Sequence, residues 1–508
     1  MTKWTLAGST ALATLAFGSV ALAGVTPEDV WKSWQDMSAS SGQKVTATSE
    51  TRDGDTLLVE GMRIEARQDG VLVVGEIDEL FFTDIGEGIV EITMSDEYPL
   101  TITMDPDEGE TKPTTVKILV KQPGLTMSAG GGDGETGYDF DAPLVSIAVE
   151  SIDGVDAAVI DLVADLVFTG MVGTYLNGAP DAASDTRDMT TEFGATNMAV
   201  NVAFKDPESQ GALKLSVSVA DISGYSESTL IGGALMADLA AALKTGFASD
   251  GGFNYGKTVY DFSFADETEN AASNGQADSG GFTFSMDEDH LAYAGDGKGV
   301  TMVVSGSQIP FPELAASFAE ATFDLLMPIS KSDVAEDFKL VTRIVDLTVS
   351  DVLWGMIDPT SQLPRDPATL VVDATGTAKL AFDIMDPAQQ AVMGEASPGD
   401  LESLNINAVQ LKIAGAELTG AGAFTFDNTD LVTFEGMPAP TGKLEMKLVG
   451  GNGLLDKLVA MGLIPDDQAM GARMMMGMFA RPGDGVDTLT STIEFKDKGL
   501  FANGQRLQ

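Results

Sequence analysis

The sequence contains no cysteine and a single histidine, His290. Without cysteine the chain forms no disulfide, offers no thiol nucleophile and has no acceptor for a lipid anchor behind an export signal. With one histidine, zinc and copper sites of the usual ligand types are excluded. A Ser-His-Asp triad would have to use His290, but the chain has no G-x-S-x-G motif, and the acids at 287–289 indicate a hairpin turn.

Basic residues are scarce, with 29 Lys and Arg against 77 Asp and Glu and a formal net charge of −48. Such a chain repels phosphate backbones, so we expect no nucleic-acid partner. Hydrophobic residues make up 44% and are interleaved with the acids, which predicts a packed core rather than disorder. After residue 23 no run reaches the ~18 apolar residues of a transmembrane helix. We therefore expect no transmembrane segment in the mature chain.

Residues 1–23 have the pattern of a cleavable export signal. Lys3 supplies the positive start, residues 6–20 form a short apolar stretch, and Ala21-Leu22-Ala23 is an A-x-A cleavage site. We therefore expect a mature chain that begins at Gly24 and resides in the periplasm.

The mature chain alternates apolar and polar residues in short runs separated by Gly-containing turns, which is typical of antiparallel strands. The pattern predicts an α+β protein, mainly antiparallel, with long twisted or sandwiched sheets and a few packed helices. Residues 128–137 are expected to be a loop and residues 158–176 a strand. Two β-rich domains are expected, at 24–250 and 251–508, the second with a helix pair. Helices are expected from Pro27 onward and at residues 230–246, 313–326, 351–357, 454–462 and 466–479.

The last part of the chain carries the most distinctive pattern. It runs through Pro440-Thr441-Gly442-Lys443-Leu444, Leu454-Leu455-Asp456-Lys457-Leu458, Gly462-Leu463-Ile464-Pro465 and Phe495-Lys496-Asp497-Lys498-Gly499-Leu500. With the exported start, it resembles an uncharacterised family of exported alphaproteobacterial proteins, domain of unknown function 2125. The helix pair and final strand pair also resemble the end of AsmA-type envelope proteins. That second resemblance implies lipid handling, by analogy of fold.

Residues 251–258 match the phosphate-loop pattern G-x-x-x-x-G-K-T, with Lys257 at the lysine position. A working phosphate loop follows a buried strand and opens a helix. Here an expected helix precedes the motif and an expected strand follows it. We therefore interpret the match as accidental.

Acidic clusters next to glycines offer oxygen ligands of the kind that calcium prefers. One such cluster spans residues 105–110, and the other comprises Asp133, Glu135, Asp139 and Asp141. Neither fits the EF-hand pattern, so both calcium binding and plain solvated turns remain open. No other cofactor is indicated.

The helix expected at 466–479 is rich in methionine, which suits a gap in a core, an apolar ligand groove or a thioether site for Cu(I). Helical spacing puts Met474 and Met478 on one face with Met475 beside them, and Met476 on another. We take Met474, Met475 and Met478 as the candidate ligand-binding residues.

These observations favour a non-enzymatic, envelope-associated binding or structural protein that holds a lipid or another apolar ligand. The alternative is a carboxylate-dependent hydrolase of envelope glycans, whose two acids the sequence does not single out. The oligomeric state stays open.

Export predicts cleavage after Ala23, because small residues at 21 and 23 fit the signal peptidase. Intact-mass measurement of the protein from its own periplasm should give a species that begins at Gly24. A chain that still begins at Met1, or that is found only in the cytoplasm, would contradict the predicted location.

Overall fold

The computed structural model describes residues 24–508, apart from 41, 69, 107–111, 133, 159, 180–185, 207–210, 232–237 and 394–396. Its strands join one 28-stranded sheet in which the strand pairs are antiparallel. Helices lie at its ends and edges: α1 (Pro27–Ser40), α2 (Leu239–Lys244), α3 (Asp351–Ile357), α4 (Pro387–Met393), α5 (Gly451–Ala460) and α6 (Asp466–Phe479). The expected fold class, mainly antiparallel α+β, is confirmed.

The strands of the first half are β1 (Lys44–Thr46), β2 (Ser49–Asp53), β3 (Thr56–Gln68), β4 (Val71–Gly86), β5 (Ile89–Met94), β6 (Glu97–Met104), β7 (Thr114–Lys121), β8 (Thr126–Gly132), β9 (Glu135–Ile152), β10 (Val155–Asp156), β11 (Val163–Asn177), β12 (Thr186–Lys205) and β13 (Ala212–Ile231). Those of the second half are β14 (Ala248–Tyr255), β15 (Thr258–Ala265), β16 (Asn270–Ala277), β17 (Ser279–Met286), β18 (His290–Gly306), β19 (Leu314–Pro328), β20 (Glu336–Val349), β21 (Ala368–Leu380), β22 (Gly399–Ile413), β23 (Ala416–Asp427), β24 (Ala439–Val449), β25 (Arg481–Pro482), β26 (Thr488–Lys496), β27 (Gly499–Ala502) and β28 (Gln505–Arg506).

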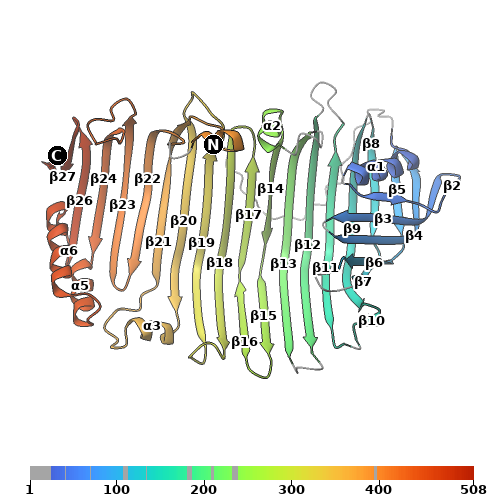
Figure 1. Ribbon diagram of the computed structural model, residues 1–508, viewed down its shortest axis with the longest axis horizontal. Coiled ribbons are helices and arrows are strands. Elements are labelled where there is room, and N and C mark those ends of the chain that lie inside the picture. Colours follow the sequence, from blue (N-terminus) through green and yellow to red (C-terminus); the bar gives the residue numbers. More distant parts are fainter. Residues whose placement is uncertain are drawn as a thin grey trace.

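The strands follow one another across the sheet nearly in chain order, so the sheet is long in the direction perpendicular to its strands (Figure 1). At two places a pair of shorter strands replaces one long strand, as β14 and β15 do beside β13. Helix α1 lies at the N-terminal end of the long axis and α5 and α6 lie at the C-terminal end (Figure 1). The domain boundary expected after residue 250 lies inside β14, whose pairing with β13 and β17 continues on both sides of it.

The N-terminal end contains the tightest core of the described chain. Thr26 and Asp29 begin α1 with a reciprocal capping pair, in which the Asp29 backbone N–H donates to the Thr26 hydroxyl at 3.2 Å and the Thr26 N–H donates to the Asp29 carboxylate at 3.0 Å. The helix then lays Trp31 and Trp34 against Phe82, with ring centroids 6.0 and 5.4 Å apart. Phe82 is completely buried. One face of the sheet is therefore closed at this end by α1.

Several expected elements are confirmed and others are wrong. Helices at 351–357 and 466–479 form as expected, and residues 163–177 are a strand. The helix expected at 313–326 is wrong, because these residues form β19 and pair with both β18 and β20. Of the helix expected at 230–246 only α2 forms in the described residues. The loop expected at 128–137 is instead part of the β8–β9 hairpin.

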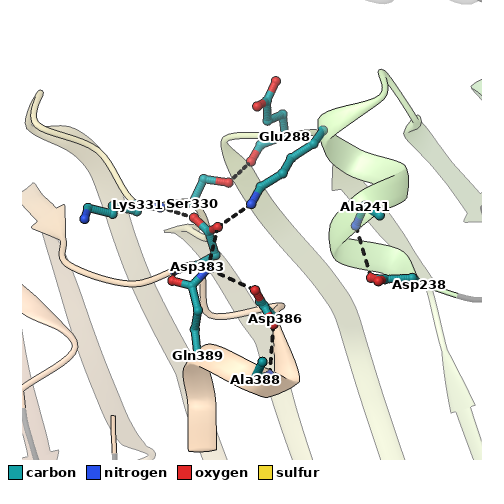
Figure 2. Close-up of polar contacts among 10 residues, drawn as sticks. Asp238, Ala241, Glu288, Ser330, Lys331, Asp383, Asp386, Ala388 and Gln389 are labelled. Carbon is teal, nitrogen blue, oxygen red and sulfur yellow. Dashed lines mark hydrogen bonds and ion pairs between the residues drawn. The ribbon is translucent and has the colours of Figure 1, made fainter. Parts of the chain in front are cut away.

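A polar network fixes the short helices at one edge of the sheet (Figure 2). The Lys244 ammonium at the end of α2 contacts the Asp383 carboxylate at 2.5 Å, and the Lys331 backbone N–H donates to the other oxygen at 2.8 Å. Gln389 of α4 donates to Asp383 and to Asp386, at 2.9 and 3.0 Å. The Lys244 contact, followed by the other donors, lowers the pKa of Asp383. The network therefore depends on an ionised carboxylate.

Lys244→Met should lower the free energy of unfolding at pH 7 by up to about 1 kcal/mol, because the lysine is half exposed. The pKa of Asp383 is depressed in the folded state, so its contribution is present above the ordinary Asp pKa of ~3.9 and is lost as pH falls through the folded pKa. Urea unfolding at several pH values should show the difference between the two proteins closing below pH ~4. Lys32→Met is the control, since Lys32 and Asp36 are both largely exposed. A difference that is independent of pH would contradict this account.

Phe82→Ala should cost about 3–5 kcal/mol, because it leaves a cavity under α1. Phe323→Ala should cost less than about 1 kcal/mol, because Phe323 on β19 is already 45% exposed. Unfolding followed by tryptophan fluorescence measures both changes. Equal losses would mean that the middle of the sheet is covered as well as its N-terminal end.

Candidate functional site

One face of the sheet carries almost only uncharged side chains. Directly paired residues of antiparallel strands point to the same face, so the strand registers trace rows of side chains across the molecule. The central row begins in the N-terminal core and runs through Phe82, Ile92, Met127, Phe140, Gly173, Phe193, Gly224, Phe253, Phe282, Gly295, Phe323, Thr342, Val372, Val409, Gly420, Met446 and Ser491. We call the face to which this row points the apolar face.

Two neighbouring rows extend the apolar face, each displaced by two residues along the strands, or by three at the register shift between Ile406 and Val409. On one side lie Tyr138, Tyr175, Thr191, Ser226, Gly251, Phe284, Tyr293, Leu325, Leu340, Ala374, Ile406, Gly422, Leu444, Ile493 and Ala502. On the other lie Ala321, Ile344, Leu370, Leu411, Leu418, Leu448 and Leu489. None of the residues in these three rows is charged, and only scattered Ser and Thr hydroxyls interrupt them.

The middle of the apolar face is open to solvent. Phe193, Phe253, Phe282 and Phe323 are 38, 43, 39 and 45% exposed, whereas Phe82 in the same row is completely buried. Adjacent exposed aromatic rings are typical of surfaces that meet a ligand, a membrane or another protein. The sequence contains the signal as alternating Phe residues, but joining those runs into one face required the registers.

Glycines shape this surface by letting aromatic rings lie flat across neighbouring strands. A Cβ atom at Gly224 would come within 2.3 Å of the Phe193 ring, and one at Gly173 within 2.5 Å of the Phe140 ring. Each ring therefore covers the backbone of the next strand instead of standing away from the sheet. The aromatic rings and the glycines together therefore form a flat, continuous apolar surface.

Helix α6 covers the apolar face at the C-terminal end and leaves a cavity beneath it. The cavity has a volume of about 270 Å³. Met475, Met476 and Phe479 line it from α6, and Met446, Leu448 and Leu489 line it from the sheet. Because Met446 belongs to the central row, this C-terminal cavity is continuous with the apolar face.

The structure separates the three methionines that we took as candidate ligand-binding residues. Met475 lines the C-terminal cavity, but Met474 and Met478 point outward and are 66 and 57% exposed. Met476, which we had placed on a different face from them, lines the cavity together with Phe479. Helical spacing could be read from the sequence, but the sequence contained no signal for which face of the helix meets the sheet.

The opposite face of the sheet carries carboxylates near its N-terminal end. Glu91, Asp139 and Glu192 occur on alternate strands of one row and line a cavity of about 810 Å³, together with Tyr225. Burial raises the pKa of Tyr225, and the nearby Asp250 carboxylate adds to the effect. Residues of the central row also line this cavity, namely Met127, Phe140, Gly173, Phe193 and Gly224. We call it the acidic cavity after its carboxylates.

Two of the four residues predicted to bind calcium border the acidic cavity. Asp139 and Asp141 lie two apart on β9 and line it, whereas Glu135 lies at the start of β9. Asp133 and much of the 105–110 cluster lie outside the described residues. Within the described part of the chain, no group of three or more His, Cys, Asp or Glu could hold a metal ion. The calcium site stays a prediction.

The phosphate-loop match and His290 both lie in strands of the sheet or in the turns between them. Residues 251–258 run from β14 into β15, so the phosphate-loop match opens a strand and not a helix. His290 follows the β17–β18 turn. Its Nδ1 lies 3.9 Å from a carboxylate oxygen of Asp287, and its Nε2 lies 3.8 Å from one of Glu336.

Comparison with known proteins finds a family match in the second half of the chain, where the sequence carries its most distinctive pattern. No curated protein and no solved structure is significantly similar to the chain. In the described residues, no helix is long and apolar enough to cross a membrane. A family model described as an uncharacterized protein conserved in bacteria (DUF2125) matches residues 258–507, which run from β15 to the end of the chain. Residues 258–507 therefore belong to the DUF2125 family.

Proposed function

We propose that the protein is an exported, periplasmic binding protein that holds the acyl chains of lipids against its apolar face. The observation that carries the proposal is the uncovered middle of that face, where aromatic rings at Phe253, Phe282 and Phe323 meet solvent. Export rests on the signal pattern of residues 1–23. The resemblance to AsmA-type proteins stays a prediction.

The dimensions of the apolar face suit long hydrocarbon chains. Strands lie ~4.8 Å apart, so the face from β9 to β26 is roughly 60 Å long, about twice the ~30 Å hydrocarbon thickness of a bilayer. Burying a whole Phe side chain contributes ~1.5–3 kcal/mol, so covering the exposed part of each ring contributes about 1 kcal/mol. The four exposed rings together contribute about 4 kcal/mol, and the aliphatic side chains of the same face add to this.

The distribution of charge favours lipids without a net negative charge. The three rows of the apolar face contain no lysine or arginine that could pair with a phosphate. The chain as a whole has a formal net charge of −48, which repels anionic head groups. We therefore expect neutral or zwitterionic lipids to bind better than anionic ones.

A glycan hydrolase is the second candidate, and the acidic cavity favours it. Carboxylates of Asp139 and Glu192 lie two strands apart there, which corresponds to a backbone separation of about 10 Å. Inverting glycosidases hold their two carboxyl groups ~6.5–9.5 Å apart. The lipid proposal stands first because it also accounts for the exposed aromatic rings.

Phe282→Asp and Phe323→Asp should each weaken binding of a fluorescent acyl probe at least tenfold, because each places a charge in the path of the hydrocarbon chain. Their melting temperatures should change little, since both rings are already partly exposed. Fluorescence titration of the purified protein measures the affinity.

The matched control is Val172→Asp. Val172 is 46% exposed, and it alternates along β11 with Gly173 of the central row, so it points to the opposite face. It should leave probe binding unchanged. If the parent protein binds no probe, or if all three variants bind it equally well, the lipid proposal is wrong.

A further inference from the structure

Helix α6 has two apolar sides, and only one of them faces the sheet. Met476 and Phe479 point inward and line the C-terminal cavity. Met470, Met474 and Met478 are spaced four residues apart, so they share the outer side, where they are 64, 66 and 57% exposed. An ordinary surface helix would be polar on its outer side.

Two further apolar side chains enlarge this outer surface. Leu463, just before α6, is 52% exposed, and Met475, at the border between the two sides, is 59% exposed. We call Leu463, Met470, Met474, Met475 and Met478 the methionine ridge. Thioether side chains are flexible and polarisable, so such a ridge adapts to a surface without fixed shape.

The C-terminal part of the chain, which carries the methionine ridge, has no formal net charge. Residues 439–508 contain eight Asp and Glu and eight Lys and Arg, so they are neutral, and the net charge of −48 belongs to the preceding chain. Figure 1 places α5 and α6 at the far end of the sheet from the N-terminal strands. Screening over ~8 Å at physiological ionic strength keeps most of that distant charge from acting at the ridge.

We propose that the methionine ridge docks on the surface of a lipid bilayer. Local neutrality removes the repulsion that the rest of the chain would meet there, and the apolar side chains can enter the boundary between head groups and acyl chains. Met475 belongs both to the ridge and to the lining of the C-terminal cavity. A docked α6 would thus bring the bilayer next to the end of the apolar face.

This inference rests on the proposed function, because the role of docking would be to supply acyl chains to the apolar face. The two can nevertheless fail separately. Docking depends on the outer side of α6, whereas acyl binding depends on the apolar face of the sheet.

The test is flotation of the mature protein with vesicles of phosphatidylcholine, a zwitterionic lipid without net charge. The parent protein should float with the vesicles, and Met470→Gln, Met474→Gln and Met478→Gln combined should reduce the bound fraction at least tenfold. Glutamine keeps the length and helix propensity of methionine, so α6 should still form. Circular dichroism and melting temperature check this.

The control combines Met356→Gln with Ile357→Gln at the end of α3, where the two side chains are 61 and 53% exposed. It should float like the parent. The inference is overturned if the parent fails to float, if the triple variant floats equally well, or if the control loses binding to the same extent. It is also overturned if the triple variant only turns a dimer into a monomer in sedimentation, because a second copy would then be the occupant.

Acyl-probe binding by the triple variant separates the two proposals. Retained probe binding with lost flotation supports docking as a distinct role of the ridge. Flotation by a parent protein that binds no probe would leave docking supported and the proposed function wrong.

Discussion

The structure depends on a simple constraint of antiparallel sheets: side chains of directly paired residues point to the same face, and an apolar face has to be covered. In this chain the cover is incomplete. Helix α1 closes the N-terminal end over the fully buried Phe82, and α6 closes the C-terminal end over Met446. Between them Phe323 lies in the same row with nearly half of its surface exposed. Stability therefore comes from the covered ends and from the hydrogen bonds between strands, and the middle of the apolar face is open to solvent.

The two faces divide the chemistry of the protein. The apolar face is uncharged along its three rows, and the opposite face carries carboxylates such as Asp139 and Glu192. This separation lets a chain with a net charge of −48 present a long apolar surface. The acids keep the protein hydrated, while glycines such as Gly224 let rings lie flat on the other side. Both the acyl-binding proposal and the docking proposal follow from where charge is missing.

Local patterns in the sequence predicted the local structure. They failed where pairing with strands distant in the sequence decides which element forms. The start of α1 at Pro27 and the span of α6 could be predicted, because both depend on neighbouring residues. The helix expected at 313–326 is wrong because its alternation, with Ala321, Phe323 and Leu325 on one face, gains partners only once β18 and β20 lie beside it. The inward direction of Met476 also depends on the sheet. The apolar face could not be predicted, since it exists only through the registers of many strand pairs.

The central claim is that acyl chains occupy the apolar face, and photo-crosslinking tests it most directly. A phosphatidylcholine carrying a diazirine in one acyl tail would be irradiated with the mature protein, and the labelled peptides would be mapped by mass spectrometry. The account predicts labels on strands β14, β17 and β19, at or beside Phe253, Phe282 and Phe323. Labels confined to the acidic cavity around Asp139 and Glu192, or no labelling above that of a denatured control, would contradict it.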